Sequence, residues 1–282
     1  MKKQQIIVIS GGIILLLGIY FFGQTVPSKK PAAATPAAGT SQSFDIQLAI
    51  QGATAKLPEH QQTYVSGLTQ SVVRGDVKEQ QIKAFRQLAA FWSDSARAFL
   101  PFAYYTAEAA KLENSEKSLT FAAQLLLDNL RGIEQPEVKS WLAGQSKELF
   151  EKAIVLNPNS DSLKVGLGST FIFGAPADNP QAVMQGIQQV LEVSRRDSTN
   201  VYAQKMLGIG GILSGQYDKA VERLEKVAKS EPEDLEVMLM LAEGYERSGQ
   251  KAKAIEWYEH AAEHISNPAL KAELTKRIQQ LK

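Results

Sequence analysis

The stretch GQYDKAVERLEKVAKSEP, residues 215–232, returns in altered form as GQKAKAIEWYEHAAEHIS, residues 249–266. The two copies begin 34 residues apart. The same offset relates other landmarks of the two regions: Ala220 and Ala254, Leu224 and Tyr258, Val201 and Leu235, and Leu207 and Leu241. A fixed period of this length is typical of solenoids, in which each unit leaves an apolar face that only the next unit covers.

The recurring residues resemble the tetratricopeptide repeat (TPR), a pair of helices with the pattern W-x2-L-G-x2-Y, then A-x3-F, then P. The first copy carries Leu207-Gly208, Gly215, Tyr217, Ala220 and Pro232. The second copy carries Leu241-Ala242, Tyr245, Gly249, Ala254, Tyr258 and Ala261. The resemblance implies an all-α helix-hairpin repeat solenoid, a TPR-like superhelix. In it the small residue after the leucine lets the two helices of a pair lie close together, and Tyr245 and Tyr258 fill the space between helices.

Segments before residue 199 continue the pattern with decreasing similarity. Residues 147–158 are expected to form a second helix of a pair, and residues 161–173 a first helix with Leu167-Gly168 in the leucine and small positions. The sequence GAPADNP, residues 174–180, predicts a turn that lengthens the connection before a helix beginning near Gln181. Further helices are predicted at residues 78–92, 96–112, 119–130 and 137–156.

Composition and pattern together divide the chain into five regions. These are an N-terminal transmembrane anchor (1–23), a linker rich in Pro, Ala, Ser and Thr (24–43), a helical region with degenerate repeats (44–145), TPR-like repeats (146–266) and a C-terminal capping helix (267–282). Residues 44–75 are expected to form one or two lead-in helices that break at Leu57-Pro58. The capping helix carries four apolar residues on one face that can cover the last repeat: Leu270, Leu274, Ile278 and Leu281.

The anchor is predicted from an uncharged, mostly apolar run of 17 residues, Ile6–Phe22, which lies between two pairs of lysines. At ~1.5 Å per residue a helix of this length spans about 26 Å, close to the roughly 30 Å hydrocarbon core of a bilayer. A cleaved signal peptide is the alternative, but the run is longer than the usual apolar region of such peptides. The flanking charges favour, by one amine, a cytoplasmic N-terminus and a soluble part on the extracytoplasmic (periplasmic) side.

The charge and cysteine content exclude several functions. Lysine and arginine together number 31 against 30 aspartate and glutamate residues, so no basic field exists to attract nucleic acid. The chain contains no cysteine, which excludes disulfides, thiolate metal sites and a cysteine nucleophile. We therefore expect no nucleic-acid partner and no chemistry based on sulfur.

Candidate chemical motifs are incomplete. His260 and His264 lie four residues apart, a spacing that can bind zinc, but HAAEH is not HExxH and no third ligand is apparent, so no metal site is assigned. The glycines at 166–168 and 208–211 belong to no phosphate-binding motif, and Gly168 and Gly208 match the small packing position. Gly166 and Gly210 remain unexplained, since glycine costs up to ~1 kcal/mol inside a helix. They either loosen their helices or admit close contact with a neighbour.

In TPR arrays the inner wall of the superhelix is lined mainly by the first helix of each pair, and these positions transfer to two units of this chain. The unit that starts at Val201 offers Tyr202, Lys205, Ile209, Ile212 and Leu213. The unit that starts at Leu235 offers Glu236, Leu239, Glu243, Glu246 and Arg247. The candidate partner-binding groove comprises Tyr202, Lys205, Ile209, Leu239, Glu243 and Arg247. Packing against an adjacent helix is the alternative for its apolar members.

This wall is apolar with one cation in the first unit and largely acidic in the second, so an amphipathic or extended segment with basic flanks would be complementary. The carboxylate-binding function of some TPR proteins is not expected, because Ile209 stands where those proteins place asparagine. The sequence thus predicts a membrane-anchored TPR-type scaffold that binds protein or peptide partners in complex assembly or envelope organisation, with no cofactor, small-molecule substrate or enzymatic activity. The alternatives are a permanent structural subunit of a membrane complex and a metal-dependent enzyme based on His260 and His264.

Overall fold

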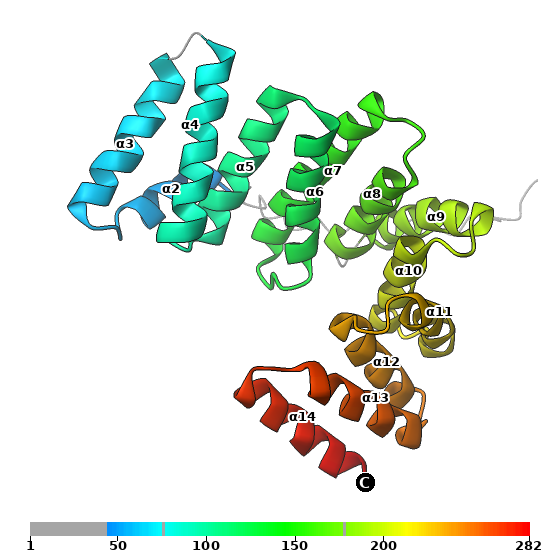
Figure 1. Cartoon of the computed structure of the whole chain (residues 1–282). Coiled ribbons are helices and arrows are strands. Elements are labelled where there is room, and N and C mark those ends of the chain that lie inside the picture. The colour runs from blue at the N-terminus through cyan, green and yellow to red at the C-terminus, as the bar shows by residue number, and fades with distance from the viewer. Residues whose placement is uncertain (1–43, 75–76, 177–178) are drawn as a thin grey trace, which may run out of the picture. The chain divides into compact units, whose positions relative to one another are not determined.

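The computed structural model describes residues 44–74, 77–176 and 179–282, and every regular element within these ranges is helical (Figure 1). The elements are α2 (Ile46–Thr54), α3 (Glu59–Arg74), α4 (Lys78–Ala90), the π-helical turn η1 (Phe91–Ser95), α5 (Phe99–Glu113), α6 (Glu116–Leu130), α7 (Pro136–Leu156), α8 (Asp161–Gly174), α9 (Pro180–Arg196), α10 (Val201–Leu213), α11 (Tyr217–Ser230), α12 (Leu235–Arg247), α13 (Lys251–His264) and α14 (Pro268–Leu281). The helices predicted from the sequence are all present, including the two lead-in helices. The predicted anchor and linker lie outside these ranges. Within the ranges, none of the helices combines the length and apolar character needed to cross a membrane.

Consecutive helices pack as hairpins: α4 with α5, α6 with α7, α8 with α9, α10 with α11, and α12 with α13. The first helices of successive hairpins also contact one another, α6 with α8, α8 with α10 and α10 with α12. We call the surface formed by α4, α6, α8, α10 and α12 the first-helix surface. Figure 1 shows the hairpins following one another in chain order from α2 to α14. This is the helix-hairpin repeat arrangement that the 34-residue period predicts.

Local residues set where these helices begin and end. Ser115, Ser160, Asn200 and Asp234 each cap a helix N-terminus, their side-chain oxygens accepting a backbone N–H three residues further on. Gly215 and Gly249, which open the two quoted copies, have φ values of 76° and 80°, in the left-handed region that glycine favours. The recurring glycine is therefore required by the turn between the two helices of a hairpin.

Small residues on the first helices allow close packing within the hairpins. A Cβ on Gly208 would lie 2.6 Å from Leu224 Cγ, and one on Gly168 would lie 2.7 Å from Val190 Cγ2, so any side chain there would separate the helices. Gly166, unexplained by the sequence, is a position of the same kind. A Cβ on it would lie 2.4 Å from the ring of Phe150, which is 1% exposed. Gly166 therefore admits close contact with α7.

The buried apolar residues form two clusters, one over α2–α5 with η1 and one from α5 to α14. Tyr245 is 2% exposed and Tyr258 is 8% exposed, which confirms that they fill the space between helices. At the C-terminal end α14 packs on α13 and buries Leu274 and Ile278, whereas Leu270 stays exposed. The described residues from 44 to 282 belong to one compact unit. The residue at which degenerate repeats give way to typical ones stays a prediction.

Candidate partner-binding site

Two of the predicted groove residues, Tyr202 and Lys205, are held by partners within the protein. The Lys205 ammonium lies 2.5 Å from Asp234 Oδ2 and 3.0 Å from Glu236 Oε2, and its side chain is 19% exposed. The Tyr202 hydroxyl donates a hydrogen bond of 3.0 Å to Gln124 Oε1 on α6. Burial raises the pKa of Tyr202 to about 12, so this hydroxyl is a neutral donor at physiological pH.

A residue at the end of α6, distant in the sequence, contacts one of the carboxylates that bind Lys205. Arg131, at the end of α6, forms an ion pair with Glu236 at the start of α12, and its guanidinium lies 5.5 Å from the centre of the Phe173 ring. We call Gln124, Arg131, Tyr202, Lys205, Asp234 and Glu236 the inner cluster. Its contacts show that the first-helix surface curves enough to bring the end of α6 next to the start of α12.

The inner cluster is electrostatically satisfied. Burial alone lowers the pKa of Lys205, but its hydrogen bonds to Asp234 and Glu236 outweigh that effect and raise the pKa above its usual value. The pKa values of Asp234 and Glu236 fall below theirs, because contacts with Lys205, and for Glu236 also with Arg131, outweigh the opposing effect of burial. The acidic character expected of α12 is therefore largely neutralised at its first turn, and basic flanks on a partner would find little free charge there.

The apolar groove residues separate into buried and exposed ones. Ile209 is 1% exposed and Ile212 is 4% exposed, because both pack against neighbouring helices. This burial favours the packing alternative for Ile209, and its assignment to the groove stays a prediction. Leu213, at the end of α10, is 66% exposed. Leu239 lines an opening of about 470 Å³ that it shares with Tyr258 and residues of α14.

The remaining groove residues lie at the C-terminal end of α12. Glu243 and Arg247 have side chains that are 38% and 57% exposed, and they form a loose ion pair with 3.8 Å between Arg247 Nε and Glu243 Oε1. Glu246 is paired with Arg277 of α14 and accepts a hydrogen bond of 3.0 Å from Tyr258. Glu243 and Arg247, like Leu213 and Leu239, thus remain accessible to a partner, and their participation in binding stays a prediction.

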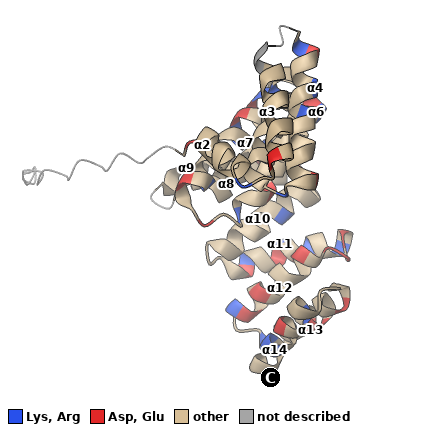
Figure 2. Cartoon of the chain, turned by 90° about the vertical axis from the view of Figure 1, so that its left-hand side faces the viewer, with Lys and Arg blue, Asp and Glu red and all other residues tan. Residues whose placement is uncertain are grey.

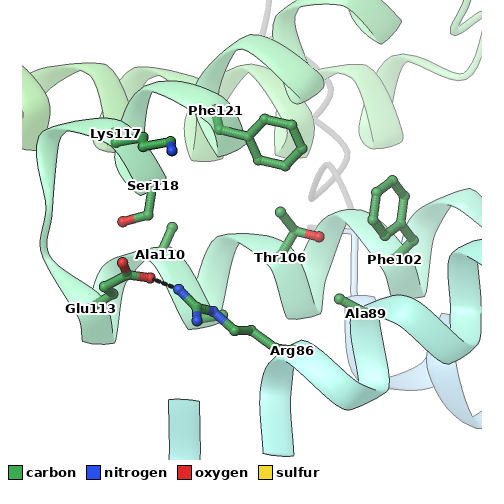
Figure 3. A pocket seen from close by; sticks show the side chains of 10 residues that line it. Arg86, Ala89, Phe102, Thr106, Ala110, Glu113, Lys117, Ser118 and Phe121 are labelled. Atoms are coloured by element: carbon green, nitrogen blue, oxygen red, sulfur yellow. Dashed lines mark hydrogen bonds and ion pairs between the residues drawn. The ribbon is translucent and has the colours of Figure 1, made fainter. Parts of the chain in front are cut away.

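A different opening in the first-helix surface was not predicted. Within the part of the chain that the structure describes, α4 and α6 lack the mutual packing that joins α6, α8, α10 and α12. Between α4 and α6 lies a cavity of about 430 Å³ with α5 as its floor (Figure 3). We call it the α4–α6 cavity. Its lining residues are Arg86, Ala89, Phe102, Thr106, Ala109, Ala110, Glu113, Lys117, Ser118 and Phe121.

The α4–α6 cavity has an aromatic end and a charged end. Figure 3 shows Phe102 and Phe121 at one end, and Arg86, Glu113 and Lys117 at the other. Phe121 is 62% exposed, whereas Arg86 and Glu113 form an ion pair. Large apolar side chains exposed beside an opening favour burial of a partner's apolar group. One sequence signal could have found the site, because Phe121 lies out of phase with the buried positions of α6.

The charged residues of the structure do not form another obvious site. Lysines and arginines are interleaved with acidic residues over the helices rather than gathered in one patch (Figure 2). His264 Nδ1 lies 3.0 Å from the carbonyl oxygen of His260, whose ring stacks edge-on against Trp257. In residues 44–74, 77–176 and 179–282 no three His, Cys, Asp or Glu side chains converge as metal ligands.

The fold and the first-helix surface define a helical-repeat solenoid, a class built to present an extended surface to a partner. Residues 212–276 match the family model described as tetratricopeptide repeat. This part of the chain is therefore a TPR region, and the described residues as a whole have the all-α TPR helix-hairpin superhelix. Among curated proteins, none matches the sequence.

Solved structures are similar in fold at low sequence identity. The crystal structure of TTC0263, a thermophilic TPR protein of Thermus thermophilus, has a TM-score of 0.51 at 16% identity, and the match covers 73% of this chain and 98% of that one. PilF of Pseudomonas aeruginosa has a TM-score of 0.46 at 15% identity, covering 72% and 85%. YrrB, described as a TPR protein with an unusual peptide-binding site, has a TM-score of 0.40 at 15% identity, covering 68% and 91%.

Proposed function

We propose that this protein is a membrane-anchored TPR-type scaffold that binds protein or peptide partners in complex assembly or in the organisation of the cell envelope. TPR proteins are typically scaffolds without enzymatic activity, which agrees with the incomplete chemical motifs of the sequence. The observation that carries the proposal is the α4–α6 cavity. It is an opening in the first-helix surface with apolar walls, an exposed aromatic side chain and a charged rim.

The cavity favours a partner segment with one large apolar side chain followed or preceded by an acidic one. The apolar side chain would contact Phe102 and Phe121 over the small floor residues Ala109 and Ala110. Lys117, at the other end, is exposed and has no ion pair within the described residues, so an acidic group of the partner complements it. Apolar burial of this kind supplies the binding free energy, and the charge supplies orientation.

The membrane anchor and the extracytoplasmic location of the repeats belong to the same proposal. They are supported by the length of the apolar run Ile6–Phe22 and by the lysines that flank it. The linker at residues 24–43 would hold the repeats away from the bilayer, where they can reach a partner.

A permanent structural subunit is the second candidate, and one observation favours it. Val155 is 81% exposed at the end of α7, Met184 is 52% exposed on α9 and Leu213 is 66% exposed on α10. Apolar side chains on several faces would be covered in a stable complex. A permanent subunit predicts that the protein never occurs free of its partner in cells, whereas a scaffold predicts a free pool.

The proposal is tested by placing a photo-cross-linking amino acid at Phe121 in the full chain expressed in its native cells. The matched control is Val155, which is also apolar and is 81% exposed but does not line the cavity. A partner that cross-links from Phe121 and not from Val155 supports the proposal. Cross-linking from Val155 alone would place the binding surface on another face.

A second step uses the partner segment that the cross-link identifies. Its affinity for the full chain is measured with Phe121→Glu and with Val155→Glu. We expect Phe121→Glu to weaken binding by at least about tenfold, since a buried aromatic anchor contributes roughly 2 kcal/mol or more. Equal affinities of the two variants would refute the assignment of the cavity.

A further inference from the structure

A smaller opening lies among α8, α9, α10 and α11 and shares no residue with the α4–α6 cavity. Its volume is about 290 Å³. Its apolar wall consists of Ile172, Ile187, Leu191 and Leu207. Gly210 and Gly211 complete the wall, and neither has room for a side chain without a shift. A Cβ on Gly210 would lie 3.2 Å from Ile172 Cγ2, and one on Gly211 would lie 2.9 Å from Ala220 Cβ.

Arg223 lines this opening, is half-buried and forms no ion pair within the part of the chain that the structure describes. Its Nη1 donates to Gln204 Oε1 at 2.8 Å and to Ser194 Oγ at 3.4 Å, both neutral acceptors. Gln204 is itself 3% exposed and donates to Ser194 Oγ and to the carbonyl oxygen of Ser198. This buried network fixes the position of the Arg223 guanidinium and leaves its remaining N–H groups without a partner in the described residues.

Arg131 is also half-buried, and comparison with it shows that Arg223 lacks, among the residues described, an ion pair with a carboxylate. Arg131 forms an ion pair with Glu236, as partly buried guanidinium groups usually do. The acidic residue next to Arg223 is Glu222, which is exposed and lies 3.0 Å from Lys226 instead. Lys219 lies one helical turn before Arg223, also lines the opening and forms no ion pair within the described ranges. Two cations thus share one side of α11, and in the described residues neither forms an ion pair, since Glu222 acts on Arg223 only through its charge.

We infer that this opening is a binding site for a small apolar carboxylate, a group about the size of a leucine side chain that carries one carboxylate. The carboxylate binds the free N–H groups of Arg223, with Lys219 adding positive charge at the entrance. The apolar body lies against Leu191 and Leu207, next to the backbone of Gly210. This assigns a function to Gly210, whose presence inside a helix the sequence alone does not explain.

The size of the opening limits the ligand. Sites for drug-sized ligands have volumes of about 300–1,000 Å³, so an opening of about 290 Å³ accepts a smaller molecule or a single terminal residue. The same chemistry occurs in two sources, a free branched or short-chain carboxylic acid and the C-terminal residue of a polypeptide. Both present an apolar group next to a carboxylate.

Ligand-observed NMR titration of the full chain in a non-ionic detergent tests the site, with detergent alone as the blank. The three probes are 4-methylpentanoate, N-acetyl-leucine and N-acetyl-leucinamide, of which the last is neutral. We expect saturable binding of at least one carboxylate and none of the amide. Binding of N-acetyl-leucine alone identifies a polypeptide C-terminus as the source, and binding of 4-methylpentanoate identifies a free acid.

Two variants locate the binding. Arg223→Met removes the charge and is expected to weaken carboxylate binding by at least about tenfold, since hydrogen bonds to charged groups contribute roughly 1.5–3 kcal/mol. Gly210→Met fills the opening without replacing Arg223, so it should abolish binding even if loss of the guanidinium perturbs Gln204. Because Ile172 must shift to admit the new side chain, circular dichroism and urea denaturation check that this variant keeps the wild-type fold. The control is Arg195→Met, an exposed arginine of α9 that does not line the opening. The inference is overturned if neither carboxylate binds, if the amide binds equally well, or if Gly210→Met retains wild-type affinity.

Discussion

Replacement of Lys205 by methionine is expected to lower the free energy of unfolding by about 1–3 kcal/mol at pH 7. The Lys205 ammonium contacts Asp234 at 2.5 Å and Glu236 at 3.0 Å with a side chain only 19% exposed. Hydrogen bonds to charged groups contribute roughly 1.5–3 kcal/mol, whereas exposed ion pairs contribute at most about 1 kcal/mol. The free-energy contribution of a partly buried ion pair such as that of Lys205 lies between these two values. Glu236 keeps Arg131 in the variant, but Asp234 keeps only the backbone N–H groups that it caps.

The loss of unfolding free energy in Lys205→Met should depend on pH, and the pKa shifts determine the direction of that dependence. Asp234 and Glu236 have pKa values below their usual ones in the folded state, so their contribution is present above the unfolded values of about 4 and disappears as the pH falls through the folded ones. The pKa of Lys205 is raised, so its contribution is present below the unfolded value of about 10.4 and disappears at higher pH. The difference between wild type and Lys205→Met should therefore be largest between about pH 5 and pH 10.

Urea denaturation of the full chain, followed by circular dichroism at pH 7 and at pH 3, measures both effects. The control is Arg247→Met, because Arg247 is 57% exposed and its ion pair with Glu243 is 3.8 Å long. We expect the control to change stability by less than about 0.5 kcal/mol. The reasoning is refuted if Lys205→Met costs no more than Arg247→Met at pH 7, or if its cost is as large at pH 3.

Three further predictions follow from single positions. Gly166→Ala should destabilise the protein by about 1–2 kcal/mol in urea denaturation because its Cβ overlaps the Phe150 ring. Gly144→Ala, whose Cβ would meet nothing within 4 Å, should stabilise the protein by about 0.5–1 kcal/mol. A change of the same sign in both variants would contradict the packing argument. Phe121→Ser should leave stability within about 0.5 kcal/mol, since Phe121 is 62% exposed, while it weakens partner binding; a larger loss of stability would show that the side chain is part of the core. The native chain has no cysteine, so a single cysteine at the exposed Ser230 should react with a membrane-impermeant maleimide from the extracytoplasmic side; labelling only after lysis would place the repeats in the cytoplasm.

The fold could be predicted from the sequence because each repeat uses short-range rules. Gly215 and Gly249 each lie at a turn that needs a left-handed residue, and Tyr245 and Tyr258 are buried on the two helices of the α12–α13 hairpin. Such constraints act over fewer than 40 residues, so a 34-residue period shows them directly. Before residue 199 the landmarks weaken but the apolar periodicity remains, as in α6, and this was enough to place the helices.

The inner cluster could not be predicted, because it depends on how far each hairpin rotates relative to the last. Lys205 was assigned to the groove by its position in the repeat, which does not show the carboxylates that pair with it. Its partner Asp234 lies 29 residues away and Glu236 contacts Arg131 from 105 residues away. Pairing over these distances follows from the curvature of the stack, which sums small rotations that no single repeat encodes.

The α4–α6 cavity results from a contact that is missing, and a repeat pattern describes only the contacts that recur. Yet one residue indicated it. The buried positions of α6 are Leu119, Ala122, Ala123, Leu126, Leu127 and Leu130, a set with the spacing of one helix face. Phe121 lies about 200° around the helix from Leu119, at ~100° per residue, and an aromatic residue there has no core to enter. In a stack of hairpins, such a side chain on a first helix faces either a neighbouring first helix, here α4, or an opening. Because α4 does not pack against α6, Phe121 faces an opening, and this is why the first tests of partner binding belong at that residue.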